Sequence, residues 1–203
     1  RLAELAEPYD VVVVSDEIHC DLTFADKPRH TMLANLAGPE DALVTAVAPS
    51  KSFNMPGLGL SALVIPDADR RKAMKDVFES MHLPQCNPFS SVGFEAGYRH
   101  GASWLDELMA YLQANRDYVV EAVAQRLPGV RVSAPEGTYL MWLDCRGLGL
   151  DDAGLKRFFV REAGVGMNPG LSFGDPGSGF MRLNIGCPRS VLEEVIGRIE
   201  AAL

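Results

Sequence analysis

Short apolar runs separated by turn residues dominate the first third of the chain. Residues 11–17 read VVVVSDE, and a continuous β-branched run of this kind is typical of a strand buried on both faces of a parallel sheet. Two similar runs follow, ALVTAVA at 42–48 and LSALVIP at 60–66, and a helix capped by one of two preceding aspartates is expected over 70–81. This alternation predicts an α/β fold with a mostly parallel sheet.

The middle of the chain has the pattern of a long helix. Apolar residues recur at helical spacing over 90–127, with an interruption expected near Gly101. Pro128 and Gly129 end the pattern.

The chain from Val130 onward mixes both periods, which predicts a small α+β domain. The expected elements are a hairpin over 130–145, a helix over 151–163, a strand over 180–186 and an amphipathic helix over 190–203. A capping box, with Ser190 as the cap and Glu193 as its partner, is expected to start this last helix.

Composition and charge narrow the class of protein. The chain has 203 residues, of which 47% are apolar and 23% charged, as in an ordinary soluble globular protein. A formal net charge of −8, with no cluster of Lys and Arg, argues against general nucleic-acid binding. There is no run of about 18 apolar residues and no signal-peptide pattern, so we predict a cytoplasmic protein without membrane insertion.

Four cysteines, Cys20, Cys86, Cys145 and Cys187, lie far apart in the chain. None forms a C-x-x-C pair, and no histidine stands at zinc-ligand spacing from them. We therefore predict free thiols in a reducing compartment and no metal site.

Three polar residues follow the ends of apolar runs in the first part. Lys51 comes just after ALVTAVA, where an ammonium group is costly unless it is paired or chemically used; the alternative is an ordinary surface lysine. Asp16 directly follows VVVVS, so it could share one edge of a parallel sheet with Lys51, or it could cap a turn. His19 follows three residues later, and a single histidine is more often structural than catalytic.

Arg182 stands inside the apolar strand pattern FMRLNIG. An unpaired guanidinium in such a strand is expensive, so a partner is expected. That partner is either an internal carboxylate, in a salt bridge, or the carboxylate of a substrate, which the planar fork of arginine binds well. The local sequence leaves both open.

Four ordered motifs resemble the C-terminal half of pyridoxal-phosphate (PLP) enzymes of fold type I: SDEIH at 15–19, PSKSFNMPGLG at 49–59, GTYLMWLD at 137–144 and GFMRLNIGCPR at 179–189. They look most like the class I/II aminotransferase-like branch that contains the MalY/PatB cystathionine β-lyases. The resemblance covers essentially the whole chain.

The resemblance implies a division of the chain into three parts. Residues 1–85 would be the C-terminal half of the PLP-binding large domain, and residues 86–127 a helical connection between domains. Residues 128–203 would be the small C-terminal α+β domain. In this family a homodimer builds each active site, so a homodimer is implied as well.

The resemblance also gives five residues a role. Lys51 matches the lysine that binds the aldehyde of the cofactor covalently, and Asp16 matches the aspartate that keeps the pyridine nitrogen protonated. His19 occupies a place near the 3-hydroxyl where many aminotransferases have a tyrosine. Ser50 would be a phosphate ligand beside the lysine. Arg182 matches the arginine that holds the α-carboxylate of an amino-acid substrate.

Two departures from the family pattern affect the phosphate site. Ala48 stands three residues before the lysine, where many relatives have a hydroxyl residue, and residues 53–60 contain no Lys or Arg. The helix N-terminus and the aromatic residue that complete the site in the family lie upstream of Arg1. We therefore expect these 203 residues by themselves to bind PLP poorly and to show little or no activity.

The reaction implied for the whole protein is carbon–sulfur β-elimination from a sulfur-containing amino acid, giving a thiol, pyruvate and ammonia. A class I/II aminotransferase would use the same residues and is the first alternative. A regulatory, partner-binding protein is the second alternative, although the intact Lys51, Asp16 and Arg182 argue against lost catalysis.

Overall fold

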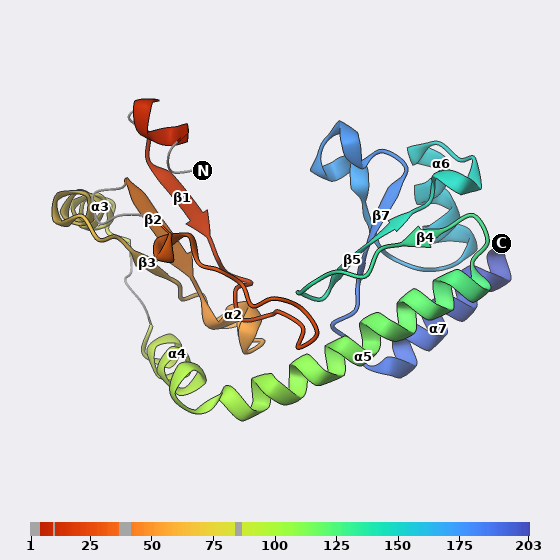
Figure 1. Cartoon of the computed structure of the whole chain (residues 1–203), viewed down its shortest axis with the longest axis horizontal. Helices are drawn as coiled ribbons and strands as arrows, with labels where there is room; N and C mark the ends of the chain where they lie inside the picture. The colour runs from red at the N-terminus through yellow and green to blue at the C-terminus, as the bar shows by residue number, and fades with distance from the viewer. Residues whose placement is uncertain (1–4, 10, 37–41, 84–86) are drawn as a thin grey trace. The chain divides into compact units, whose positions relative to one another are not determined.

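The computed structural model describes residues 5–9, 11–36, 42–83 and 87–203 (Figure 1). The chain forms two compact units: the first takes in Arg1–Thr23 and Arg29–Glu107, the second Phe24–Pro28 and Leu108–Leu203. The predicted boundary between residues 85 and 86 lies outside the described residues, and the three-part division stays a prediction. In the described part of the chain, no helix is long and apolar enough to cross a membrane.

The first unit contains a three-stranded sheet in the order β1-β2-β3. β1 (Val13–Asp16) runs parallel to β2 (Leu43–Val47), as the two apolar runs predicted. The predicted burial of the first run on both faces is wrong for the described chain, because Val11, Val12 and Val14 are 48%, 52% and 63% exposed. β3 (Ala62–Val64) pairs with β2 in the antiparallel direction, so the described sheet has one parallel and one antiparallel pairing. A three-residue apolar strand does not encode its own direction, because the path of the chain between strands sets it.

Short helices and one longer helix connect these strands. α3 (Ala68–Ser80) starts at Asp67, whose side chain accepts a hydrogen bond from the Arg70 amide at 2.7 Å, so one of the two predicted caps is confirmed. The shorter elements are η1 (Glu7–Tyr9), η2 (Leu33–Asn35), α2 (Pro49–Ser52) and η3 (Pro56–Leu58).

The predicted long helix is broken at Gly101, as expected. α4 (Pro88–His100) ends there and α5 (Ala102–Arg126) begins directly after it. The side chain of Asn87 caps α4 by accepting from the Ser90 amide at 2.9 Å. The division between the two units falls within α5.

Two glycines, Gly97 in α4 and Gly101 at its C-cap, make room for side chains of the loop that follows Lys51. A Cβ atom on Gly97 would lie 2.9 Å from Cδ2 of Phe53 and 2.9 Å from Cε of Met55. A Cβ on Gly101 would lie 2.6 Å from Cε1 of Phe53. Contacts this short admit no side chain without movement of the neighbours, so these glycines allow the loop to pack on α4.

The second unit is built on a four-stranded sheet in the order β4-β5-β7-β6, and every pairing in it is antiparallel. Its strands are β4 (Arg131–Val132), β5 (Leu140–Asp144), β6 (Asn168–Pro169) and β7 (Phe180–Asn184). Its remaining elements are η4 (Arg146–Leu148), α6 (Asp152–Arg157), the π-helical turn η5 (Phe158–Glu162), η6 (Gly170–Phe173), η7 (Asp175–Gly177) and α7 (Arg189–Ala202).

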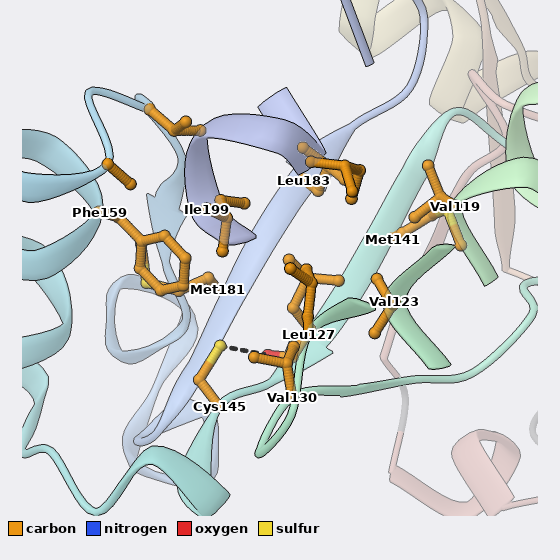
Figure 2. Packing of buried hydrophobic residues seen from close by; sticks show 14 of the residues in the cluster. Val119, Val123, Leu127, Val130, Met141, Cys145, Phe159, Met181, Leu183 and Ile199 are labelled. Atoms are coloured by element: carbon orange, nitrogen blue, oxygen red, sulfur yellow. Dashed lines mark hydrogen bonds between the residues drawn. The ribbon is translucent and has the colours of Figure 1, made fainter. Parts of the chain in front are cut away.

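One hydrophobic core holds the second unit together. Figure 2 shows side chains of α5, of β5 and β7, of η5 and of α7 gathered in a single cluster. Val119 of α5, Leu143 of β5, Phe159 of η5 and Ile199 of α7 have no exposed surface. Each element thus contributes one apolar face to the same core. This explains why the sequence from Val130 onward shows both the helical and the strand period of apolar residues.

The start of α7 differs from the prediction. The helix begins at Arg189, its N-cap is Pro188, and no side chain caps it, so the expected capping box at Ser190 is wrong. The proline fixes its own backbone angle just before the helix, and Ser190 therefore lies inside the first turn.

Five residues from the early part of the chain, Phe24–Pro28, belong to the second unit. The guanidinium of Arg116 is buried, and it donates to both carboxylate oxygens of Asp26 at 3.0 Å. The Phe24 ring lies beneath it, with its centroid 4.5 Å from the Arg116 Cζ. One backbone hydrogen bond, from the Phe24 amide to the Glu136 carbonyl at 3.0 Å, also holds this segment to the unit.

Candidate functional site

Asp16 and the segment that carries Lys51 leave the same edge of the first sheet. Asp16 is the last residue of β1 and lies opposite Ala46 of β2, and the Glu17 amide donates to the Ala46 carbonyl at 2.9 Å. β2 ends at Val47, and α2 (Pro49–Ser52) follows at once, with proline in the first turn. Because β1 and β2 are parallel, their carboxyl ends coincide, and ligands of α/β sheets bind beyond such ends.

Lys51 lies on α2, half-buried. Among the described residues its Nζ has no hydrogen bond and no ion pair. The side-chain nitrogen is therefore available to a ligand. This availability is what a lysine needs if its amine is to react with an aldehyde.

The charges of Lys51 and Asp16 both act on His19. Burial lowers the pKa of His19, the positive charge of Lys51 lowers it further, and the negative charge of Asp16 opposes these effects. The imidazole is therefore neutral at pH 7. The structure thus brings Asp16, His19 and Lys51 together. The sequence predicted a shared sheet edge for Asp16 and Lys51, and only the family resemblance added His19 to them.

Asp16 keeps part of its carboxylate free. The side chain is exposed, and its Oδ1 accepts a hydrogen bond from the Ile18 amide at 3.2 Å. Its other oxygen has no hydrogen bond within the described part of the chain. Asp16 therefore does cap a local turn, and it still has an acceptor for a second donor such as a protonated ring nitrogen.

Ser50 precedes Lys51 on α2 and is half-buried. Its hydroxyl has no hydrogen bond to any described residue, so it remains available to a ligand. Ala48, the departure noted in the sequence, is the N-cap of α2 and offers no side-chain oxygen there.

Two buried polar contacts that the sequence analysis missed support this site. Ser52 is fully buried, and its hydroxyl donates to Asp21 Oδ2 at 2.6 Å, which ties α2 to the loop after β1. Glu17 is buried next to Asp16 and binds His30 Nε2 at 2.7 Å and the Leu33 amide at 2.9 Å. The signal for both was present in the polar run SDEIHCD, directly after an apolar strand.

The hydrogen bonds of Glu17 outweigh its burial. Burial alone raises the pKa of Glu17, but the bonds from His30, Leu33 and Ser15 lower it, and the net pKa lies below its ordinary value. Glu17 is therefore an anion at neutral pH, and it fixes the loop that follows Asp16.

Arg182 belongs to the second unit, on β7 opposite Trp142 of β5 and Asn168 of β6. Its Nη2 donates to Asn168 Oδ1 at 3.1 Å, and its Nε is buried with no hydrogen-bond partner. It forms no ion pair with any described residue, so the predicted internal salt bridge is absent from the described residues. An uncompensated guanidinium with an unused donor fits a substrate carboxylate.

The thiols agree with the prediction where they are described. Cys20, Cys145 and Cys187 are free, and Cys86 lies outside the described residues. No group of His, Cys, Asp and Glu in the described part of the chain could hold a metal ion.

Comparison with known families identifies the class of protein. The family model "Aminotransferase class I and II" matches residues 1–199. The chain therefore belongs to the class I and II aminotransferase family.

Individual relatives are more specific. The chain is 40% identical to "Cystathionine beta-lyase PatB" of Bacillus subtilis and 37% identical to "Protein MalY" of Escherichia coli. These alignments cover 100% and 98% of this chain but 52% and 51% of the relatives, so the chain spans about half the length of the curated relatives it matches.

Solved structures share the fold. Cystalysin from Treponema denticola, which contains pyridoxal 5'-phosphate, matches with a TM-score of 0.92 and 29% identity over 99% of this chain and 51% of its own. The chain therefore has the fold of the C-terminal half of PLP-dependent enzymes of fold type I, as the four motifs predicted.

Proposed function

We propose that the whole protein is a PLP-dependent carbon–sulfur β-lyase of the cystathionine β-lyase type. It would convert a sulfur-containing amino acid and water to a thiol, pyruvate and ammonia, the thiol leaving from Cβ and the water releasing the nitrogen as ammonia. The observation that carries this proposal is Lys51 itself, which has no ion pair with any residue the structure describes and lies beside His19 and Asp16 at the carboxyl ends of two parallel strands. The similarity to PatB and MalY supports the lyase over other reactions of the same fold.

Three residues have polar atoms without a hydrogen bond in the described part of the chain, and these atoms match what PLP and an amino acid require. Lys51 offers an amine for the aldehyde, Asp16 an acceptor for the pyridinium N–H, and Arg182 donors for a carboxylate. When bound, the cofactor supplies an electron sink for the pair of electrons released at the substrate Cα.

Each residue would then contribute a separate task. Lys51 acts as the general base that takes the Cα proton, since it carries no competing ion pair. Asp16 keeps the ring nitrogen protonated by its negative charge. Arg182 fixes the substrate carboxylate and thereby the direction of the Cα–H bond.

Two further residues complete the cofactor side of the proposal. His19, neutral and half-buried, would lie near the 3-hydroxyl, and the hydroxyl of Ser50 would bind the phosphate. Because Ala48 offers no hydroxyl, we infer that phosphate binding depends mainly on residues outside this chain. The 203 residues alone are expected to retain little PLP.

The test uses the whole, PLP-loaded protein with cystathionine and no keto acid. Pyruvate should accumulate over many turnovers while the absorbance of the cofactor returns to its starting spectrum. Lys51→Ala should abolish pyruvate formation and the visible band of the lysine-bound cofactor, because both need the amine. A single turnover that leaves the cofactor in its amine form would contradict the lyase and support an aminotransferase.

An aminotransferase is the second candidate, and the family to which the chain belongs favours it. A regulatory role in which the protein binds a partner is the third. Partner binding should survive Lys51→Ala, whereas lyase chemistry should not, so one variant separates these two. A homodimer and a cytoplasmic location also belong to the proposal, and light scattering tests the first.

A further inference from the structure

Two arginines of the second unit each stack on a phenylalanine. The Cζ of Arg182 lies 4.5 Å from the centroid of the Phe173 ring, and the Cζ of Arg146 lies 4.9 Å from that of Phe180. The Trp142 ring stands edge-on between the two phenylalanines, 5.3 Å from Phe173 and 6.3 Å from Phe180. These five side chains form one aromatic ladder with a cation at each end.

The two cations differ in how their charge is balanced. Arg146 binds Asp144 with two hydrogen bonds, at 2.8 and 2.7 Å, so a carboxylate of the chain itself neutralises it. Arg182 has no such partner among the described residues; its one hydrogen bond goes to the neutral amide of Asn168, and its Nε is unused. No carboxylate in the described part of the chain therefore balances its charge, and the guanidinium is available to an anionic ligand.

An arginine side chain that has no carboxylate partner needs other contacts to fix its conformation. Its side chain has several rotatable bonds, and ordering them at the moment of binding weakens the complex. Here the ring of Phe173 fixes the plane of the guanidinium, and Asn168 fixes one of its nitrogens. Phe173 is itself 51% exposed, so its hydrophobic burial contributes little, and its contacts with Arg182 and Trp142 are its main described interactions.

We propose that Phe173 is a positioning residue for Arg182. Its ring holds the guanidinium flat, so that the free edge can bind the α-carboxylate of an amino acid. This inference rests on the proposed function only in that Arg182 binds a substrate carboxylate. It does not require that the reaction be an elimination.

The test compares two ligands that differ only by a carboxylate, L-alanine and ethylamine. Neither has a leaving group on Cβ, so binding to the whole, PLP-loaded protein is read from the cofactor absorbance without elimination. The ratio of their dissociation constants measures how much the carboxylate contributes. Phe173→Leu should reduce this ratio about tenfold, within the range of about 2- to 30-fold that a cation–π contact supports.

Matched variants separate positioning from general stability. Phe173→Tyr keeps the ring and should retain most of the carboxylate preference. Phe180→Leu removes the equivalent ring beneath Arg146, whose charge Asp144 already balances, and should leave the preference unchanged. Phe173→Met is a second apolar substitution without a π face, with an unbranched and more adaptable side chain, and it replaces the leucine variant if that one does not fold.

The outcomes distinguish this inference from the proposed function. An unchanged preference in folded Phe173→Leu and Phe173→Met overturns the inference, as does a wild-type protein that binds L-alanine no better than ethylamine. If cystathionine gives no pyruvate but Phe173→Leu still weakens the preference, the lyase proposal is wrong and the role of Phe173 stands.

Discussion

Replacing a helix glycine by alanine should affect stability differently at two places in this protein. Gly97 lies in α4 and Gly197 in α7, both within regular helix. An added Cβ at Gly97 would meet Phe53 and Met55 side-chain atoms at 2.9 Å, whereas at Gly197 the nearest atom, Nη2 of Arg126, would lie 3.8 Å away. The same substitution therefore meets a filled space in one helix and an ordinary contact in the other.

Two effects compete at Gly97. Alanine favours the helix over glycine by about 1 kcal/mol, while forcing a methyl group into a packed site costs about 1–3 kcal/mol. At Gly197 only the first effect operates. The helix term is common to both variants, so the difference between their unfolding free energies isolates the packing cost against Phe53 and should be about 1–3 kcal/mol.

Differential scanning calorimetry of wild type, Gly97→Ala and Gly197→Ala under identical conditions measures this difference. Each of the two units is a domain of about 100 residues. For a domain of that size, a change of 1 kcal/mol in the free energy of unfolding shifts the Tm by about 4–8 °C. Gly197→Ala should raise its transition, and Gly97→Ala should lower or fail to raise its own. Equal increases for both variants would refute the idea that Phe53 is seated against the glycines of α4.

Three other predictions concern buried polar groups. The hydrogen bond from His30 helps to keep the pKa of Glu17 below its ordinary value. The ionised Glu17 therefore stabilises the fold at a pH above the ordinary pKa, and this stabilisation is lost as the pH falls through the lowered pKa. Glu17→Gln should make the free energy of unfolding, measured with urea, depend less on pH below about pH 4. Burial raises the pKa of Cys145 to about 12, so iodoacetamide at neutral pH should leave its peptide unlabelled by mass spectrometry, and rapid labelling would count against its burial. Ser52→Ala removes a bond to the Asp21 carboxylate worth about 1.5–3 kcal/mol, which should speed the loss of PLP on dialysis of the whole protein; an unchanged rate would contradict this role.

Strong patterns in the sequence predicted the elements that the structure confirms. The β-branched run before Asp16 and the apolar run before Lys51 gave two strands and their parallel pairing. The break at Gly101 was visible as a glycine inside a helical pattern. The strands and the helix break are local features, because each depends on residues that are neighbours in the sequence. The parallel pairing was inferred from the α/β alternation of the elements.

What the sequence did not predict depends on contacts between distant segments. The direction of β3 and the two-residue strand β6 have too few residues for a periodic signal. The bond between Ser52 and Asp21 joins residues 31 positions apart, and the stacking of Phe173 on Arg182 joins a loop to a strand. The resemblance named Arg182, but only the structure reveals that no carboxylate among the described residues balances it.

The short segment Phe24–Pro28 has a consequence for any attempt to divide the protein. Cutting the chain where α5 passes from one unit to the other would give residues 108–203 without this segment. Arg116 would then lose the ring of Phe24 and the carboxylate of Asp26, although its guanidinium sits in a buried place. Such a piece should be less stable than the same unit in the intact chain.

The early position of Phe24–Pro28 in the chain also affects how the second unit folds during synthesis. Asp26 leaves the ribosome 90 residues before its partner Arg116, and Phe24 leaves long before Glu136. The second unit therefore cannot complete its packing from residues 108–203 alone. Its contact between Asp26 and Arg116 joins residues far apart in the sequence, and contacts of this kind slow folding.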